Sequence, residues 1–368
     1  MRGLLSLSES QLMNDLPIFQ SPICPLPLAH HAQVTIGHGS GGQLTHQLIS
    51  DVFQKHFNHP ALTQGNDGAL IDLASQTAQQ KLVVSTDAHI VTPLFFAGGD
   101  IGRLAVCGTV NDVAMMGADP KYLTVSFVIE EGFPIDQLEQ IALSMSSACA
   151  EAGISIVAAD TKVTEKGKAD GLFISTTGFG LLPAGRLIAG DQARPGDAVI
   201  VTGSLGNHTI AIAEARGNLG FQSGVESDTA PLNHLTSALL AEIDDVHVLR
   251  DPTRGGLATT LVEITRQSGV TIELDEASIP IDQPVWAACS MLGLDPLYLA
   301  NEGKAIVILP EAKASKAIEV LKTNPYGRNA AVIGRVVNVE KARLLLKTPF
   351  GTTRVLDMLA GEMLPRIC

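Results

Sequence analysis

The segment from Leu104 to Met116 constrains the fold more than any other part of the sequence. Its residues are almost all apolar, and their run predicts a long buried helix. The helix nevertheless carries the polar step Asn111-Asp112. A carboxylate on an apolar helix is costly unless it is paired or binds a cation. We therefore expect the Asp112 carboxylate either to be paired with another group or to bind a cation.

Strands are predicted on both sides of this helix, and a second, amphipathic helix spans 135–151. Because not every strand is separated from the next by a helix, the order favours an α+β domain over a doubly wound sheet. A further set of strands and one helix indicates a second α/β domain. The strands of the two sets are expected at 81–87, 122–129, 154–158, 172–180, and at 197–201, 271–274, 305–309 and 331–336, and the helix at 257–267.

A length of 368 residues fits two domains. Residues 1–33 are expected to be a disordered extension, because 21–27 are too rich in proline for regular structure. The first domain is expected at 34–186 and the second at 187–345. Residues 346–368 then form a terminal segment and a mobile tail.

The composition excludes several classes of protein. A hydrophobic fraction of 45% and a charged fraction of 17% describe a globular chain, and a net charge of −13 argues against a general nucleic-acid binder. None of the five cysteines forms a CxxC pair, so neither a zinc knuckle nor a disulfide framework is indicated. No apolar run approaches the ~20 residues of a membrane helix. Free thiols fit a reducing cytosol, and we expect a cytoplasmic protein.

A glycine-rich segment follows a predicted strand at 34–36 and precedes a helix. Backbone N–H groups of such a turn can bind phosphate at the helix start. The segment contains Gly39, Ser40, Gly41 and Gly42 but is neither a Walker A motif nor an in-register GxGxxG. An ordinary glycine turn is the competing interpretation.

Four aspartates are the candidate metal ligands. They are Asp67, Asp87, Asp112 and Asp160. Hard carboxylate oxygens suit Mg²⁺ shared with substrate phosphates. Helix caps and turns are the alternative, since Asp favours both; that alternative is strong for Asp67 and weak for Asp112.

Three further segments are less specific. Lys162 and Glu302 adjoin predicted strands of different domains, and an exposed surface charge is the default explanation for either. Residues 253–256 precede a helix and could bind an anion at its N-terminus, or form a simple loop. Together these features suggest an ATP-dependent enzyme with carboxylate-bound magnesium.

The tail ends in Pro365-Arg366-Ile367-Cys368. Pro365 disfavours a helix here, and the stretch from Gly361 to Cys368 reaches about 23–25 Å when extended. The Cys368 thiol could therefore travel between the interior and an outside partner. A frayed terminus is the alternative, although Ile367 and Cys368 are apolar, which is unusual for a disordered tail.

These motifs, taken in order, resemble those of the carbamoyl dehydratases of hydrogenase maturation, the HypE family. The resemblance covers about residues 34–368 and rests on 37–42, 85–87, 111–114, 160–163, 250–256, 301–304 and 365–368. It implies a two-domain α+β fold of the aminoimidazole-ribonucleotide-synthetase (PurM-like) superfamily, with a homodimer formed through the N-terminal sheets.

The resemblance also implies a reaction and its partners. A HypF-type carbamoyltransferase would place a carbamoyl group on Cys368. ATP would activate the carbamoyl oxygen, and loss of phosphate would leave a thiocyanate. The cyanide would pass to a HypC–HypD scaffold for the iron of a nickel–iron hydrogenase.

Residue roles follow from the same resemblance. Glu302 is the expected base, and Lys162 is expected to stabilise charge on the oxygen or phosphate. Mg²⁺ would bind Asp87 and Asp112, helped by Asp67 and Asp160. Residues 37–42 would close over ATP, with nucleotide contacts from Asn111, Thr161 and Arg254.

Two departures from the family pattern are visible, and two other functions compete. Ala159 replaces a usual glycine, and Asn207 and Thr209 replace a usual aspartate and glycine in what is expected to be a structural turn.

One competing function is another ATP-using enzyme of the superfamily, such as selenophosphate synthetase or thiamine-monophosphate kinase. The former has a reactive Cys or selenocysteine near its glycine loop, which 37–42 lack, and the latter needs no terminal thiol. The second is a non-catalytic carrier that accepts a group on Cys368, which would not need Lys162, Glu302 and the aspartates together.

Overall fold

The computed structural model describes residues 42–53, 66–72, 81–217, 222–338, 341–359, 364 and 366–368. All of them belong to one compact unit, Ile36–Cys368. The expected extension at 1–33, the strand at 34–36 and Gly39, Ser40 and Gly41 lie outside the described residues. Gly42 is the residue that precedes α1 (Gln43–Leu48), which continues as a π-helical turn, η3 (Ile49–Phe53).

The first sheet has five strands and is mixed, as an α+β domain requires. All neighbouring strands are antiparallel except β5 and β6, which are parallel. The strand order is β1 (Ala69–Asp72), β2 (Lys81–His89), β7 (Leu172–Leu182), β5 (Asp119–Glu130) and β6 (Ser155–Thr164). Strand β6 is therefore at an edge, and nearly all its residues are exposed.

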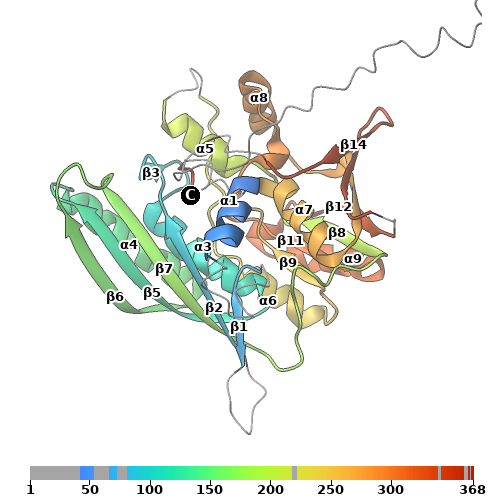
Figure 1. Cartoon of the computed structure of the whole chain (residues 1–368), viewed down its shortest axis with the longest axis horizontal. Helices are drawn as coiled ribbons and strands as arrows, with labels where there is room; N and C mark the ends of the chain where they lie inside the picture. The colour runs from blue at the N-terminus through green and yellow to red at the C-terminus, as the bar shows by residue number, and fades with distance from the viewer. Residues whose placement is uncertain are drawn as a thin grey trace, which may run out of the picture. The chain divides into compact units, whose positions relative to one another are not determined.

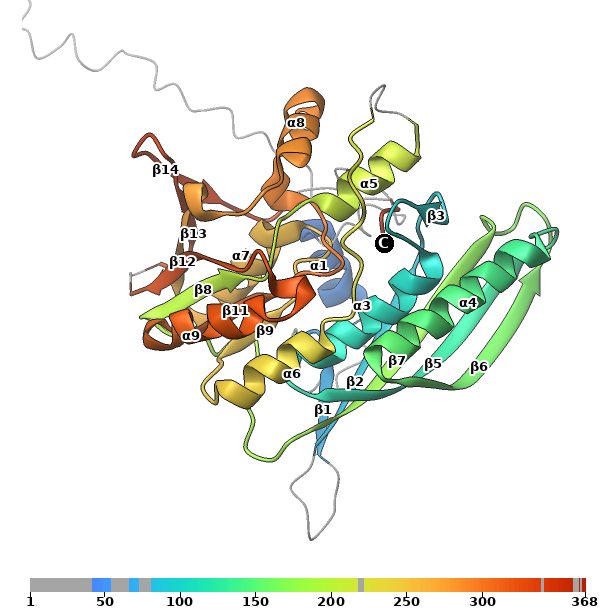
Figure 2. The same ribbon diagram turned by 180° about the vertical axis from the view of Figure 1, so that it is seen from behind.

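Two helices cover one face of this sheet. They are α3 (Ile101–Met115) and α4 (Ile135–Ala152), and Figures 1 and 2 show both on the same side. The predicted apolar helix is confirmed: nearly every residue of α3 is buried. Asp100, at the end of a short ribbon of β3 (Phe95–Phe96) and β4 (Gly99–Asp100), caps its N-terminus by accepting from the Gly102 and Arg103 amides at 2.7 and 3.1 Å.

Close packing of α3 against β7 depends on a missing side chain. A Cβ at Gly180 would overlap the Val113 side chain. The glycine therefore lets the helix backbone approach the strand, and this approach brings the Asn111-Asp112 step of α3 over the sheet.

The second sheet has seven strands. Its order is β14 (Thr353–Leu356), β13 (Leu344–Lys347), β10 (Thr271–Asp275), β12 (Ala331–Val337), β8 (Asp197–Val201), β11 (Ile306–Pro310) and β9 (Val248–Arg250). Only the β10–β13 pair is parallel. The helices that follow or connect these strands are α5 (Asn207–Ala215), α6 (Asn233–Glu242), α7 (Gly256–Ser268), α8 (Gln283–Leu292) and α9 (Glu311–Lys322), with 3-10 turns at Glu276–Ser278, Pro296–Tyr298 and Pro325–Gly327.

The central strands β8 and β11 are buried on both faces. Val199 and Val201 pack in one apolar cluster with residues of α7, whereas Ile200 packs in a second cluster with residues of α6 and α9. Alternating side chains of one strand thus enter two cores. This explains why these strands are continuous apolar runs rather than alternating ones.

The expected domain junction falls between the two sheets, because β7 ends at Leu182 and β8 begins at Asp197. The exact boundary at 186/187 stays a prediction. Among the helices of the described ranges, none is both long enough and apolar enough to span a membrane.

Candidate active site

Carboxylates from several elements lie close enough to affect one another's charge where α3 lies over the first sheet. Asp87 is on β2, Asp112 is on α3, Asp67 precedes β1, and Asp251 directly follows β9. The Ser85 hydroxyl donates to Asp112 Oδ2 at 2.6 Å. We call these four residues the aspartate cluster.

Burial and repulsion from neighbouring carboxylates raise the pKa values of three carboxyl groups of the aspartate cluster. Burial, followed by the charges of Asp251, Asp87 and Asp67, raises the pKa of Asp112 well above its ordinary value. Burial raises the pKa of Asp67 to about 6, although Arg250 opposes this shift. The pKa of Asp251 rises to about 8, mainly through burial and then through Asp67. Each carboxylate would be stabilised by an added cation.

One arginine offsets part of this charge. Arg250 Nε lies 2.7 Å from Asp67 Oδ1, and its Nη2 lies 2.9 Å from Glu263 Oε2. The other oxygen of Asp67, Oδ2, is buried and has no hydrogen-bond partner among the residues described. A second arginine, Arg254, lies 3.9 Å from Asp87.

These features fit Mg²⁺ carried with phosphate oxygens. Buried carboxylates with raised pKa and an unpartnered Asp67 oxygen provide hard ligands. Within the described ranges, no three His, Cys, Asp or Glu side chains converge on one ion position. A bound ion would therefore take other ligands from substrate and water, which is usual for Mg²⁺.

The loop that carries Glu302 is fixed by its neighbours. Asn301 is fully buried; its Oδ1 accepts from the Gly206 amide at 2.7 Å and its Nδ2 donates to the Pro252 carbonyl at 3.0 Å. A Cβ at Gly303 would overlap the Asp228 carbonyl oxygen, so only glycine fits there. Asp228 in turn accepts from the Glu302 amide at 3.1 Å.

The tail is docked beside Glu302. The Ile90 amide donates to a main-chain carboxylate oxygen of Cys368 at 3.3 Å, and the Thr92 amide donates to the Arg366 carbonyl at 3.2 Å, in an antiparallel pairing. Ile367 is buried in the core that α3 shares with the first sheet. Figures 1 and 2 show the C-terminal end beside β3. The expected mobile thiol is thus seen in an inward position.

The surroundings of the Cys368 thiol keep it protonated. Burial raises its pKa, Arg254 opposes the shift, and Glu302 adds to it through its charge and a hydrogen bond with the thiol. Burial also raises the pKa of Glu302 well above its ordinary value, followed by the charges of Asp251 and Asp87. Thiol, carboxyl and aspartate cluster therefore form one electrostatic site.

Three predicted site residues lie elsewhere. Asp160, Thr161 and Lys162 are on the exposed edge strand β6, where Lys162 Nζ lies 3.3 Å from Asp160 Oδ2. Strand β2, which carries Asp87, is three strand spacings away, or about 14 Å. Within one chain these residues and the aspartate cluster do not come together.

Of the other predicted residues, Arg254 lies with the aspartate cluster, as described above. Both ends of the Asn111 side-chain amide form hydrogen bonds within the protein. Nδ2 donates to the Ala230 carbonyl at 3.0 Å, and Oδ1 accepts from the Leu232 amide at 2.8 Å. Its predicted contact with nucleotide is not tested by these bonds.

Sequence reasoning missed Asp251, Arg250 and His89. His89 is buried, and its Nε2 lies 3.7 Å from Asp87 Oδ2. Asp87 and His89 are two apart on one strand and so share a face, a signal that the sequence contains. Asp251 follows a strand directly, in a motif already noted, but its approach to Asp67 depends on the pairing of distant segments.

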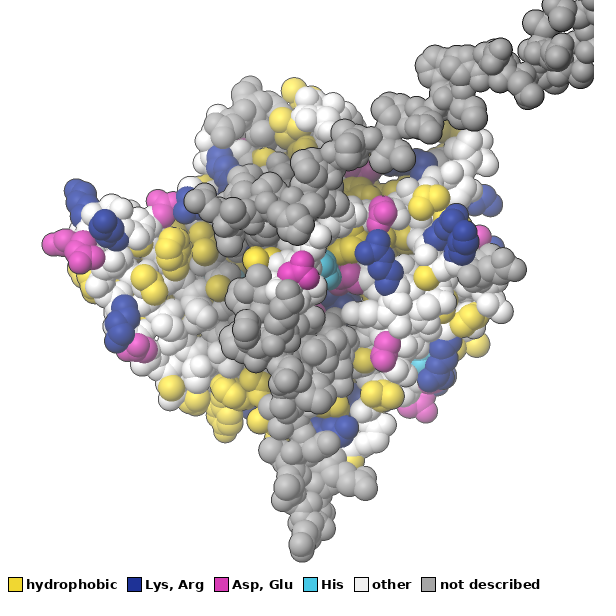
Figure 3. Space-filling model, in the orientation of Figure 1, with side chains coloured by type: hydrophobic (Ala, Val, Ile, Leu, Met, Phe, Trp, Pro, Cys, Tyr) yellow, Lys and Arg dark blue, Asp and Glu magenta, His cyan; other side chains and the backbone are white. Residues whose placement is uncertain are grey.

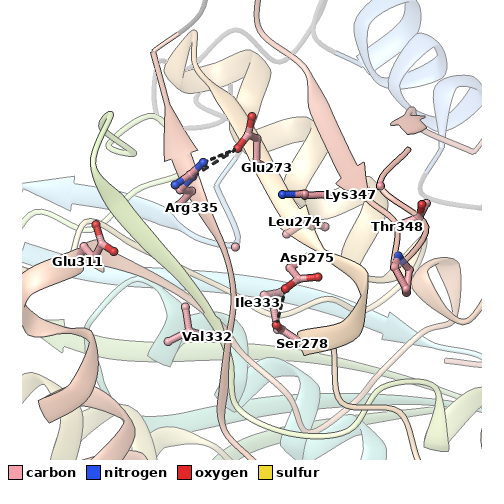
Figure 4. Close-up of a pocket in the computed structure, with 13 residues that line it drawn as sticks. Glu273, Leu274, Asp275, Ser278, Glu311, Val332, Ile333, Arg335, Lys347 and Thr348 are labelled. Atoms are coloured by element: carbon pink, nitrogen blue, oxygen red, sulfur yellow. Dashed lines mark hydrogen bonds and ion pairs between the residues drawn. The ribbon is translucent and has the colours of Figure 1, made fainter. Parts of the chain in front are cut away.

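A cavity of about 580 Å³ lies away from this site, on the second sheet. Figure 4 shows its lining from β10, β12 and the turn at 347–351, with Arg335 paired to Glu273 at 3.1 Å. None of the predicted site residues lines it, and it carries no conclusion about function.

Comparisons with known proteins agree with this site. Family models of the AIR synthase related proteins match residues 65–182 (N-terminal domain) and 194–347 (C-terminal domain). The carbamoyl dehydratase HypE of Azotobacter vinelandii is 49% identical over 338 residues, which are 92% of this chain and 98% of the relative. Such similarity over nearly the full length of both chains extends well beyond a shared fold.

Solved structures give the same result. HypE in a HypE–HypF complex is 44% identical, with a TM-score of 0.80 over 85% of this chain and 99% of the other. HypE in complex with ATP is 48% identical, with a TM-score of 0.76 over 91% of this chain and 100% of the other. The chain therefore belongs to the carbamoyl dehydratase HypE family, within the AIR synthase related proteins.

Proposed function

We propose that this chain dehydrates a carbamoyl group on Cys368 to a thiocyanate with ATP, and so makes the cyanide ligand for nickel–iron hydrogenase maturation. One observation carries the proposal: the Cys368 thiol is docked against Glu302, next to the aspartate cluster. Relatives named for this activity and a relative crystallised with ATP support it.

The chemistry can be balanced with groups of this site. The carbamoyl oxygen attacks the γ-phosphorus of ATP, ADP leaves, and the nitrogen loses one proton, giving S–C(OPO₃)=NH. The C–O bond then breaks, phosphate leaves, and the second N–H proton is lost, giving S–C≡N. Glu302 is the proposed proton acceptor, because it is buried beside the thiol that bears the group and is the carboxylate that most raises the pKa of that thiol.

Magnesium is proposed to be held by Asp87 and Asp112 with help from Asp67. When bound, it would neutralise phosphate charge. Arg254, beside Asp87, would contribute to the same charge balance. Their combined positive charge would also lower the pKa of Glu302 towards the ionised form that a base requires.

A homodimer is proposed from the first sheet. Apolar side chains of β5, β6 and β7 are exposed on it, namely Tyr122, Val128, Ile156, Val157, Val163 and Leu181. In Figure 3 the charged side chains over this sheet lie mainly at its outer end. A second copy that covers these residues would bury apolar surface without burying many charges.

The roles predicted for Asp160, Thr161 and Lys162 then require the second copy. A lysine side chain on β6 does not span about 14 Å to its own Asp87, given strand spacings of about 4.8 Å. We propose that β6 of one copy reaches the phosphate site of the other. Mixed dimers of Lys162→Ala and Cys368→Ala chains test this, because they regain dehydration only if each site combines residues of two copies.

The proposed partners act on the undocked tail. A HypF-type carbamoyltransferase would load the thiol, and a HypC–HypD complex would receive cyanide. The relative crystallised as a HypE–HypF complex supports the first partner. The extended reach of about 23–25 Å from Gly361 to Cys368 makes Cys368 accessible to both.

The test is intact mass spectrometry of the carbamoylated full-length protein before and after addition of Mg-ATP. Loss of the mass of one water is expected, with no adduct at all in Cys368→Ala and no loss in Glu302→Gln. A carbamoyl adduct that persists with Mg-ATP would make the chain a carrier. Full dehydration by Glu302→Gln would remove Glu302 as the base and leave the dehydratase itself intact.

A further inference from the structure

One buried histidine holds the docked tail next to the reactive cysteine. His208 is the second residue of α5 and is fully buried. Its Nε2 lies 2.5 Å from the carbonyl oxygen of Ile367. Its ring also packs edge-on against Phe96, with centroids 5.6 Å apart and an interplanar angle of 86°.

The partners of His208 determine where its proton is. A carbonyl oxygen only accepts, so Nε2 carries the hydrogen and donates it to Ile367. Burial lowers the pKa of His208, which favours the neutral ring. Nδ1 is then an acceptor, and the Ser227 hydroxyl, 2.8 Å away, must donate to it.

The chain of hydrogen bonds continues in one direction. The oxygen of Ser227 accepts from the Thr229 hydroxyl at 2.7 Å and from the Thr229 amide at 3.2 Å. Ser227 and Thr229 line a polar cavity of about 310 Å³ that also contains Asp228 and Lys304. Two residues of the cavity wall, Ser227 and Thr229, therefore fix the His208 tautomer that donates to the tail.

The bonded carbonyl belongs to the peptide group that joins Ile367 to Cys368. Because this group is planar, fixing its oxygen also fixes the nitrogen and the Cα of Cys368. The bond from the Ile90 amide to the main-chain oxygen of Cys368 limits the remaining rotation about N–Cα, and the two contacts together set the direction of the side chain. The Arg366 carbonyl accepts from the Thr92 amide and from Arg216, and the main-chain oxygen of Cys368 accepts from the Ile90 amide. His208 is the group best placed to aim the thiol at Glu302.

We propose that His208 is a positioning residue for the reaction: its Nε2–H, oriented by Ser227 and Thr229, holds Cys368 in the geometry in which the loaded sulfur meets Glu302. The effect on the reaction rests on the proposed function above. The effect on the tail does not, because it concerns only where the thiol lies.

The first measurement is the alkylation rate of Cys368 in the unmodified protein by N-ethylmaleimide, followed by mass spectrometry of peptide 363–368. Docking hides and protonates the thiol, so weaker docking speeds alkylation. We expect His208→Ala to speed it at least tenfold. His208→Gln, whose amide can donate to the same carbonyl, should restore much of the protection. His234→Ala is the matched control, since His234 also bonds a backbone carbonyl, that of Glu151 at 3.0 Å, but away from the tail.

The second measurement is on the carbamoylated protein with Mg-ATP. His208→Ala should accept the carbamoyl group as fully as the wild type but dehydrate it at least tenfold more slowly, and His208→Gln should recover part of the rate. Ser227→Ala removes the orienting donor and should shift both quantities in the same direction by a smaller factor. It also serves as the deciding variant if His208→Ala does not fold.

The outcomes separate the two proposals. Faster alkylation in a protein whose wild type never dehydrates would support the role in docking while the proposed function fails. Unchanged alkylation and an unchanged dehydration rate in His208→Ala, or in Ser227→Ala if the former does not fold, would overturn the positioning role even if the wild type is an active dehydratase.

Discussion

Burial of Ile367 should govern how often the reactive thiol leaves its site. Ile367 is 8% exposed and belongs to the apolar core that includes Leu104 and Ile174. Leu364 and Cys368 are only partly buried against the same core. Ile367→Ala keeps the backbone pairing of the tail with residues 90–92 but removes most of this contact.

The magnitude follows from the carbon atoms lost. Ile→Ala removes three buried carbons at about 0.8 kcal/mol each, so docking should weaken by about 2–3 kcal/mol. A free-energy change of 1.4 kcal/mol is tenfold in an equilibrium constant. The undocked fraction should therefore rise by a factor of about 30 to 150.

The assay is alkylation of Cys368 by N-ethylmaleimide at a concentration at which the tail redocks faster than the reagent reacts. The rate is then proportional to the undocked fraction, in which the thiol regains an ordinary pKa of about 8.5. Cys107, Cys149 and Cys289 are buried and do not compete. Reading the product on peptide 363–368 separates Cys368 from the fifth cysteine, Cys24. Ile135→Ala, on α4 and 76% exposed, is the control that removes the same atoms from a surface.

A rate within threefold of the wild type in Ile367→Ala would refute the reasoning. It would mean that the tail is held by its hydrogen bonds alone. An equal increase in Ile135→Ala would instead show that the assay reports global stability.

Three other outcomes are expected. Arg250→Met should lower the free energy of unfolding by about 3–5 kcal/mol in urea titrations, because it strands the buried Asp67 carboxylate; a loss under 1 kcal/mol would contradict this. Gly303→Ala should displace Glu302 by overlap with the Asp228 carbonyl and slow dehydration by about 100-fold while carbamoylation persists; unchanged rates would show that the loop is not fixed. The pKa of Glu302 is raised well above 4.5, and a protonated Glu302 cannot act as the base. The single-turnover rate of dehydration should therefore rise with pH as Glu302 ionises, well above pH 4.5, and Glu302→Gln should show no such rise. A rate that falls with pH over the same range would reverse the assigned role.

Much of the fold could be predicted because its signals are local. The apolar run around Asn111-Asp112 forms α3, as predicted, and most predicted strands appear within a few residues of their expected ends. The tail was predicted to bring Cys368 to an internal site, and the thiol lies beside Glu302. The ordered motifs identified the family, which the comparisons confirm.

The sequence by itself determined the elements, the carboxylate on the buried helix and the apolar tail, because helical and strand periodicity are set by residues near in the chain. Only the tertiary structure decided which carboxylates meet. Asp251 and Arg250 lie near Asp67 because β9 ends beside the segment that precedes β1, whereas Lys162 lies away from the aspartate cluster of its own chain because β6 pairs at an edge. Strand order depends on contacts between residues far apart in sequence, and no local pattern encodes those contacts.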